Sequence, residues 1–541
     1  MSSIRSRTLW LALALALAGL IALATSARHT LPQISGTVHV SGLHSPVTVV
    51  RDRWGVPHIY AGDEHDLFVA QGYVTAQDRL WQMLLRRQGA RGRLSEWLGT
   101  RAALADGILS RQDFPTQAAA ALPSFDEESR TTLEAYALGV NACVAMCPDP
   151  PELALLKLQG KVTQVPPWAA TDSLALSQMM QWAQAQSSAI ELRSALVSRL
   201  RPERASDLWP EGIKLAGPAL PADPAVRQVL QLTGIPLMVG NVAASAPGLP
   251  SAWYMATLRS ERITIAGATW PGLPGAVVDQ KTLIPGPSPR QREERALPLV
   301  KYLLALPPQG WLQFRVHGML RQWDYDLSGR TRLGNASAAV YEAWLWHLAR
   351  DTFQDELGPD LFARYWATGF ASAALARLAD RPGDAWWDDL TTSQHETRDD
   401  LMRRAYAEAL DHLGRHYGDL HTIWEWDTMH AAMFRHRLGE AWPVWWLDRE
   451  VKLGGDAWFD PARPDDPLRP YAPVLVPSLQ MWRDAEGQVW FVLAGGESGY
   501  PLSPHYADLL SPWARGVDVP LQDVARPQDL RDVEGVLVLT P

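Results

Sequence analysis

Hydrophobic and polar positions follow two different periods along the chain, and together they predict a protein of mixed helices and strands. Residues 36–62 alternate apolar and polar side chains in places, with Gly and Pro between the runs, as strands do. Between residues 64 and 98 the apolar residues recur at helical spacing, which indicates a helix. Two further helices are expected over residues 125–145 and 171–200. Asp172 is a candidate cap for the second, because a carboxylate can accept from free backbone N–H groups.

The middle of the chain has a different composition. Residues 202–250 are rich in Pro, Gly and Ala and indicate a connector, with one short helix expected at Ala225–Leu232. A strand-like run follows at residues 253–270. Residues 279–295 are charged, rich in Pro and without periodicity, which indicates a surface join.

The last third predicts more helices and then a return to strands. From Ser337 to Leu413 the pattern is mostly helical, with a break at Arg381–Asp384, and short strands and turns are expected after it. A chain of 541 residues is too long for one simple core, since domains hold roughly 100–200 residues. We expect two or three lobes, or one large multilayer domain.

The N-terminus predicts export. Arg5 and Arg7 precede an uncharged run from Thr8 to Ala27, and small residues offer a cut after Ala24 or Ala27. These are the features of a secretory signal peptide. The run is also near the ~20 residues that span a bilayer, so an uncleaved membrane anchor is the alternative. In both cases the body of the protein is expected outside the cytoplasm, either periplasmic or secreted.

Charge and composition exclude one class of partner. The net charge is -9 and the pI about 5.9, and no Lys/Arg stripe occurs, so we expect no nucleic-acid partner. The chain has 25 Trp residues, a high count. Most of them are expected in the core, and a surplus is compatible with an apolar ligand cleft.

The chain contains two cysteines, Cys143 and Cys147. A spacing of four places both on one face of a helix. The simplest interpretation is a pair of small buried hydrophobic residues. A local disulfide is the alternative in an oxidising compartment, and two thiols alone do not predict a metal site.

Residues 72–94 form a long string, GYVTAQDRLWQMLLRRQGARGRL, preceded by RDRWGVPHI at residues 51–59. Taken alone, Asp78–Arg79 and Arg86–Arg87 would be charges on a solvated helix face. Taken together, the two strings resemble the opening of the penicillin acylase family, whose members are exported amide hydrolases. Later strings, among them NACVA, LPSAWY, GATWPGLPGAVV and GGESGY, match the same family in order. The resemblance therefore covers almost the whole chain after the leader.

The resemblance implies an α+β fold, the αββα sandwich of the N-terminal nucleophile hydrolases with large helical regions. After a leader at residues 1–27 it implies an α-chain-like region at 28–201, a spacer-like connector at 202–240 and a β-chain-like region at 241–541. The strand, calcium loop and oxyanion Asn that the family carries after GLPGAVV have no counterpart here. We therefore expect a central deletion and a reduced sandwich, with a smaller sheet covered by the two helical regions.

Family members cut themselves just before a Ser, whose hydroxyl attacks the amide carbonyl while its own α-amine serves as base. Here Gly240 matches the residue before the cut, and Asn241 stands where Ser belongs, unless the nucleophile itself is deleted. An Asn carboxamide cannot form the acyl ester. Ser245 is a hydroxyl nearby and the candidate for a relocated nucleophile, although nothing beside it looks like an activating base.

The resemblance also implies binding residues in the helix near residue 180. Met180 and Trp182 match positions that line the acyl pocket, although plain helix core explains both equally simply. Glu191 matches a calcium ligand of the family. The alternative is an unpaired surface carboxylate, since Arg193 and Arg199 do not lie three or four residues away from it. One carboxylate does not hold calcium, which needs about 6–8 oxygens.

Two strings near the C-terminus invite a serine-based site. Ser503–Tyr506 reads SPHY, which the resemblance makes structural, and GGESGY carries Tyr500 where a GxSxG elbow needs Gly. We expect no catalytic serine in either string.

Two functions of different class remain. One is hydrolysis of the C–N bond of linear amides, such as the acyl side chains of penicillins or N-acyl homoserine lactones. The other is a catalytically inactive homologue that acts as a periplasmic binding or scaffold protein. The missing nucleophile and oxyanion Asn favour the inactive homologue. In both cases the expected ligand is a small N-acyl amide, no cofactor is required, and the calcium of the family lacks most of its ligands. A decayed gene product without function is the third interpretation.

Overall fold

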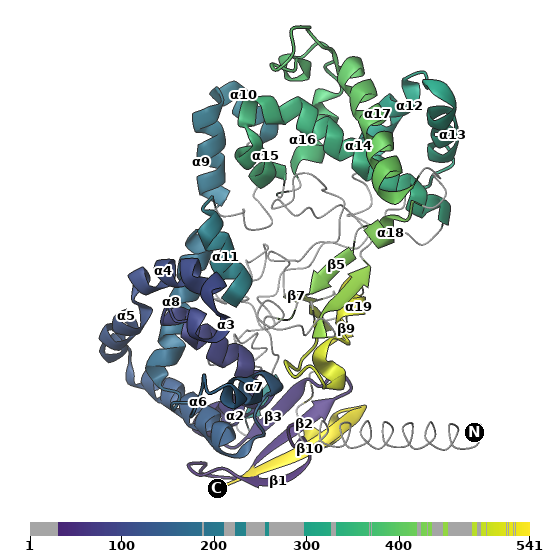
Figure 1. Ribbon diagram of the computed structural model, residues 1–541. Helices are drawn as coiled ribbons and strands as arrows, with labels where there is room; N and C mark the ends of the chain where they lie inside the picture. Colours follow the sequence, from purple (N-terminus) through teal and green to yellow (C-terminus); the bar gives the residue numbers. More distant parts are fainter. Residues whose placement is uncertain are drawn as a thin grey trace, which may run out of the picture.

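In a computed structural model the chain forms two helical regions joined by small sheets (Figure 1). The predicted leader lies outside the described residues. Among the helices that the structure describes, none is long and apolar enough to cross a membrane. The structure describes residues 31–186, 189–209, 222–233, 255–258, 297–325, 332–366, 368, 370–418, 424–429, 431–434, 436, 447–452, 479–483, 488–493, 495–514, 517, 519–522, 524 and 526–541.

The largest sheet joins the two ends of the chain. Its order is β1-β10-β2-β3-β4, so the last strand of the chain lies between the first two. β10 runs parallel to β1 and antiparallel to β2, while β3 is antiparallel to β2 and parallel to β4. The strands predicted at residues 36–62 and within 253–270 are thus confirmed. Their bounds are β1 Gly36–His39, β2 Val47–Asp52, β3 Pro57–Ala61, β4 Met255–Leu258 and β10 Val533–Thr540.

One face of this sheet packs on the helix α2, Glu64–Ala90. Val47, Val49 and Ile59 alternate along β2 and β3 with residues of the opposite face, and they join the same core as the apolar residues of α2. Asp63 begins the helix, since its carboxylate accepts the backbone N–H of Asp66 at 2.8 Å. The long helix that the spacing predicts is confirmed, although it ends at Ala90 and a separate short helix follows.

The remaining helices of the first core lie around α2. Residues 171–200 were expected to form one helix and form two, α8 and α9. Asp172 lies inside the first turn of α8 rather than before it, and its carboxylate accepts the N–H of Ala169 at 3.0 Å. The bounds are α3 Ser95–Leu98, η1 Thr100–Ala102, α4 Ala103–Gln112, α5 Phe114–Ala121, η2 Leu122–Ser124, α6 Glu127–Met146, α7 Pro151–Leu158, α8 Ala170–Ala185 and α11 Pro224–Thr233.

A second core forms the other helical region (Figure 1). It is built mainly from α14 and α17, and it contains several of the buried Trp residues, among them Trp344 and Trp346 of α14. The predicted break at Arg381–Asp384 is confirmed and is longer than expected. The bounds are α9 Ala189–Arg199, α10 Pro202–Leu208, α12 Leu297–Ala305, α13 Gly310–Leu320, α14 Arg332–Leu357, α15 Pro359–Trp366, α16 Phe370–Leu378, η5 Ala385–Trp387, α17 Arg398–Tyr417 and α18 Trp426–Met429.

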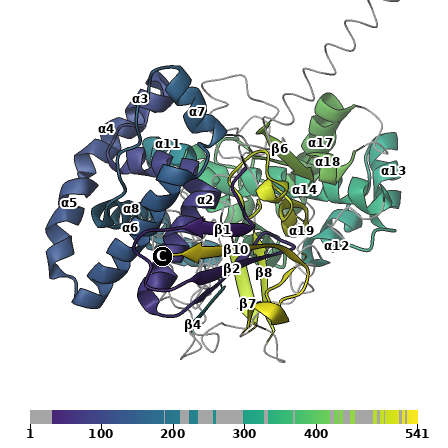
Figure 2. The ribbon, with the colours of Figure 1, turned by 90° about the horizontal axis from the view of Figure 1, so that it is seen from below.

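The C-terminal part returns to short strands, as predicted. In the described residues a sheet of β5-β6 and a sheet of β7-β8-β9 accompany the five-stranded sheet, and Figure 2 shows the strands from below. This is an α+β arrangement with small sheets. The bounds are β5 Ala431–Phe434, β6 Arg449–Lys452, β7 Leu479–Arg483, β8 Val489–Leu493, η9 Pro504–Tyr506, α19 Leu510–Ala514, β9 Val519–Pro520 and η10 Pro527–Asp529.

Candidate functional site

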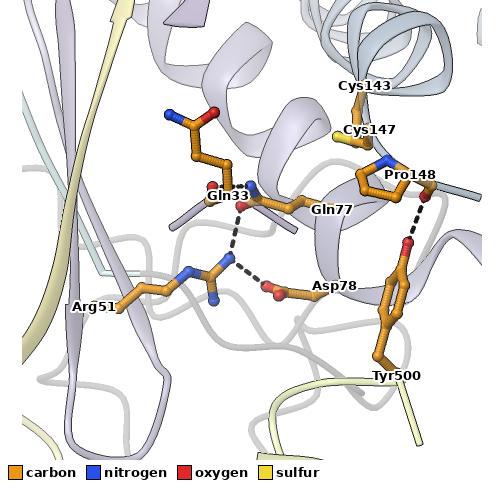
Figure 3. Close-up of a disulfide and its surroundings, with 8 residues drawn as sticks. All are labelled: Gln33, Arg51, Gln77, Asp78, Cys143, Cys147, Pro148 and Tyr500. Carbon is orange, nitrogen blue, oxygen red and sulfur yellow. Dashed lines mark hydrogen bonds and ion pairs between the residues drawn. A yellow bond between two sulfur atoms is a disulfide. The ribbon is translucent and has the colours of Figure 1, made fainter. Parts of the chain in front are cut away.

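The strings at residues 51–59 and 72–94 meet in one buried polar network (Figure 3). The Arg51 guanidinium, from β2, donates to the Asp78 carboxylate and to the Gln77 side-chain oxygen of α2, both at 2.9 Å. It also donates to the carbonyl of Gly55 at 2.9 Å. Burial raises the pKa of the Asp78 carboxyl, while the Arg51 guanidinium acts in the opposite direction. The network fixes the β2–β3 hairpin against α2.

The charged residues of α2 are not the solvated helix face that they suggest when taken alone. Asp78, Arg86 and Arg87 are all buried. Arg86 donates to the carbonyl of Thr233 at 3.2 Å, and Arg87 lies 3.5 Å from the Asp172 carboxylate. The tertiary structure decided this, because each of these partners comes from a distant part of the chain. The residues hold α2 to its neighbours.

The string GGESGY docks where α2 kinks. The backbone of Arg79 leaves helical geometry, and its guanidinium donates to the carbonyl of Gly496. The N–H of Gly499 donates to the carbonyl of Asp78 at 2.8 Å. A Cβ on Gly496 of the same string would stand 2.0 Å from the backbone carbonyl oxygen of His505, so only glycine fits at that position. The GGESGY segment therefore has a structural role, because it packs against α2.

Among the described residues, neither serine string forms a serine–histidine pair. The Ser503 Oγ accepts the backbone N–H of His505 at 3.1 Å and begins η9. The ring of His505 instead contacts Asp508 at 2.8 Å and Glu534 at 2.7 Å. The Ser498 Oγ accepts the N–H of Tyr500 at 3.1 Å. These contacts agree with the prediction that both strings are structural.

The contacts of His505 predict a pH-dependent stability. Burial lowers its pKa, but the hydrogen bonds with Asp508 and Glu534 outweigh burial, so the pKa lies above its ordinary value of 6.5. The stability from the charged ring is therefore fully present below about pH 6.5 and lost as the pH rises through the raised pKa. We expect His505→Gln to lower the urea-unfolding midpoint more at pH 6 than at pH 9. Equal losses at the two pH values would show that the ring is not charged in the folded protein.

The hairpin between β2 and β3 contains a buried pair that the sequence analysis missed. The Asp52 carboxylate accepts the N–H groups of Trp54 and Val56 at 2.9 and 3.1 Å, and its second oxygen lies 3.2 Å from Nε2 of His58. The Nδ1 of His58 has no partner among the described residues. His58 is in register with Met255 of β4. The motif RDRWGVPHI thus forms the turn as well as the strand. The spacing of Asp52 and His58 on either side of the Gly-Val-Pro turn is the sequence feature that could have predicted this pair.

Cys143 and Cys147 form a disulfide at the end of α6 (Figure 3). The simplest interpretation of the sequence, two buried thiols, was therefore wrong, and the alternative holds. The two Cα atoms lie 4.9 Å apart, because one turn of helix brings positions four apart together. Pro148 follows the disulfide, and its carbonyl accepts the hydroxyl of Tyr500 at 2.9 Å.

The predicted pocket residues lie on α8. Met180 has no exposed surface and packs in the first core, as the plain-core interpretation expects. Trp182 is half-buried, and its ring meets the ring of Phe114 edge to face, with centroids 6.2 Å apart. A binding role for Met180 and Trp182 stays a prediction.

Glu191 is not the unpaired carboxylate that was the alternative to a ligand. It forms an ion pair with the guanidinium of Arg364 on α15, and its side chain is 49% exposed. This partner cannot be read from the sequence, because helix spacing indicates only neighbours along the same helix. A calcium ion at Glu191 would have to share this carboxylate with the Arg364 guanidinium, and the role of Glu191 as a calcium ligand stays a prediction.

Asn241 and Ser245, the candidate catalytic residues, lie outside the described residues. Along the chain, the described elements on either side of them are α11, which ends at Thr233, and β4, which begins at Met255 and pairs with β3.

Comparison with known proteins identifies relatives of the chain. The profile of the penicillin amidase family matches residues 46–278 and 290–524. A penicillin acylase 2 proenzyme from Pseudomonas sp. (strain SE83) is 42% identical over 147 residues, which are 27% of this chain and 18% of that protein. The acyl-homoserine lactone acylase QuiP of Pseudomonas aeruginosa is 28% identical over 274 residues, 46% of this chain and 31% of that protein.

Among solved structures, the thermostable penicillin G acylase from Alcaligenes faecalis is similar, with 25% sequence identity and a TM-score of 0.25. That match covers 33% of this chain and 97% of the solved chain. The chain spans less than a third of the length of the curated relatives above.

Proposed function

The chain belongs to the penicillin amidase family, and on this premise we propose that it hydrolyses the C–N bond of linear amides in small N-acyl compounds. The observation that carries the proposal is the family match, which extends over residues 46–278 and 290–524. Relatives named penicillin acylase and acyl-homoserine lactone acylase support this substrate class. The buried network of Arg51, Gln77 and Asp78 gives the family's opening strings a scaffolding role in this fold.

Amide hydrolysis in this family requires a nucleophile with a neighbouring base. Asn241 follows Gly240, and its carboxamide cannot form an acyl ester. Ser245 is the hydroxyl that we propose as nucleophile, since it follows Gly240 closely in the chain. If the chain is cut before Ser245, the new α-amine would supply the base, because an α-amine titrates near roughly 7.7–8.0.

The test combines the mass of the protein with its activity. We expect the purified chain to separate into two fragments, the second beginning at Ser245, and to release the chromophore from at least one of a panel of chromogenic acyl amides. Ser245→Ala should lower this rate by roughly 1,000-fold or more, as removal of a nucleophile does. Ser251→Ala is the matched control and should keep the rate. An uncut chain that turns over none of the amides would overturn the proposal.

An inactive binding or scaffold protein is the alternative function, and it rests on the missing Ser after Gly240 and the missing counterpart of the oxyanion Asn. The comparisons do not favour it, because the relatives are named acylases. If the chain proves uncut and inactive, binding of the same acyl amides by calorimetry is the expected result for a scaffold.

We also propose an exported location and a reduced αββα sandwich. The apolar run at residues 8–27 supports export, as a signal peptide or as a membrane anchor. The disulfide between Cys143 and Cys147 also supports it, since disulfides persist in oxidising compartments. Osmotic release of the protein from intact cells would show a periplasmic location, and retention in the membrane fraction would show an anchor.

A further inference from the structure

Two histidines and two aspartates meet where the β1–β2 loop crosses the start of α2. His44 comes from the loop, and Asp63, His65 and Asp66 come from the cap and first turn of the helix. One ligand atom from each side chain lies within 4.8 Å of the other three. From this convergence we propose that His44, Asp63, His65 and Asp66 bind a divalent transition-metal ion of the zinc type, which cross-links the loop to α2.

The distances between the candidate ligand atoms are near those of a metal site. The Nδ1 of His44 lies 3.0 Å from an Asp63 oxygen and 3.9 Å from Oδ1 of Asp66. The Nδ1 of His65 lies 3.3 Å from the same Oδ1. Bonds of about 2.0–2.2 Å to a tetrahedral zinc ion place neighbouring ligand atoms roughly 3.3 Å apart. The Nδ1 atoms of the two histidines thus each lie within hydrogen-bond distance of a carboxylate oxygen, that of His44 next to Asp63 and that of His65 next to Asp66, close to the spacing that a zinc ion requires.

Asp66 makes the site rigid on one side. Its side chain is fully buried, and its two oxygens accept the N–H groups of His44 and Ser45, each at 2.8 Å. Each carboxylate oxygen has a further lone pair, so Oδ1 can still bind a cation. Asp63 is held as well, because its other oxygen caps α2 through the N–H of Asp66. The two carboxylates are thus placed before any ion binds.

The histidines are free to adjust. Their rings stack with centroids 4.3 Å apart and planes inclined by 15°. An ion between two parallel rings would lie out of both planes, so one ring must turn about its Cβ–Cγ bond. His44 can turn, because its side chain is 62% exposed.

The ligand types select the ion. Imidazole nitrogen with carboxylate oxygen suits zinc and its neighbours in the first transition series, whereas calcium takes oxygen ligands. Four protein ligands leave no open position, so the site is structural. A bound ion would stabilise the junction between the hairpin and α2. This inference is independent of the proposed acylase function.

The experiment titrates zinc chloride into the metal-free full-length protein at pH 7.5 in a calorimeter. We expect one zinc ion to bind per chain. The urea-unfolding midpoint should be higher in zinc than in chelator, because a bound ligand stabilises the folded state. His44→Asn and His65→Asn should each weaken binding at least roughly ten-fold. His395→Asn is the matched control, since His395 is exposed beside Asp388 and lies in the other helical region. It should leave binding unchanged.

Folding and metal binding can be separated. The unfolding midpoints of the His44→Asn and His65→Asn proteins in chelator should equal that of the native chain, which shows that neither change unfolds the protein. Cobalt(II) in place of zinc should give the visible absorption of a four-coordinate ion in the native chain and lose it in both variants. Absence of zinc binding by the native chain, or equal binding by the His44→Asn and His65→Asn proteins, would overturn the proposal.

Discussion

Gly139→Ala is expected to destabilise the protein by more than about 3 kcal/mol, although alanine is the better helix former. Gly139 lies in α6, where the helix crosses α2, and a Cβ there would stand 1.8 Å from the carbonyl oxygen of Val69. Gly72 in α2 makes the reciprocal approach, with a Cβ position 2.0 Å from the carbonyl of Tyr136. The obstacle in both cases is backbone, which cannot rotate away as a side chain can. The helices must separate, and the core between them opens.

The matched control is Gly107→Ala in α4. A Cβ at Gly107 meets no atom within 4 Å. The change there alters only the helix propensity, which is higher for alanine than for glycine. We therefore expect it to stabilise the protein by up to about 1 kcal/mol. Urea-unfolding curves of the native chain and the two variants give the comparison. A Gly139→Ala protein as stable as the Gly107→Ala protein would show that α2 and α6 do not cross this closely.

The second large effect is expected at the buried ion pair of Figure 3. Arg51→Met leaves the carboxylate of Asp78 buried without its cation, and breaking a buried pair in this way costs about 3–5 kcal/mol. Both side chains are almost fully buried, and the pair distance is 2.9 Å. Burial already raises the pKa of Asp78, so the carboxyl is expected to take up a proton when Arg51 is removed. Denaturant unfolding at neutral pH measures the loss.

Further variants test whether the lost stability comes from this buried ion pair or from the removal of any arginine charge. Arg415→Met breaks an exposed pair with Asp411, in which the arginine side chain is 66% exposed, and should cost less than about 1 kcal/mol. The double change Arg51→Met with Asp78→Leu removes both charges and should recover much of the stability lost in Arg51→Met. The single change Asp78→Leu completes the comparison, and a loss in the double variant equal to the sum of the two single losses would show that the charges do not interact.

The periodicity of the sequence predicted the elements in which local rules apply. The strands at residues 36–62, the long helix from Glu64 and the short helix at Ala225–Leu232 all form. Each has a strong apolar period between clear breakers, so local pattern and tertiary packing agree. The end of α8 at Ala185 was missed, because the helical period of the sequence continues beyond it into α9, which begins at Ala189.

Partners far apart along the chain could not be read from spacing. β10 inserts between β1 and β2 although it comes from the other end of the chain, and Glu191 pairs with Arg364. The burial of Asp78 likewise depends on Arg51 and on the loop around Gly499. Charge patterns along a helix do not tell whether another element will cover them.

The sequence by itself determined the family resemblance, the expected export and the absence of a Ser directly after Gly240, since these depend only on the order of residues. The tertiary structure alone decided that Cys143 and Cys147 are joined and that the charges of α2 are buried. It also brought His44 to Asp63 and His65. These outcomes depend on distances between side chains, which the packing of the elements determines and the spacing along the chain does not.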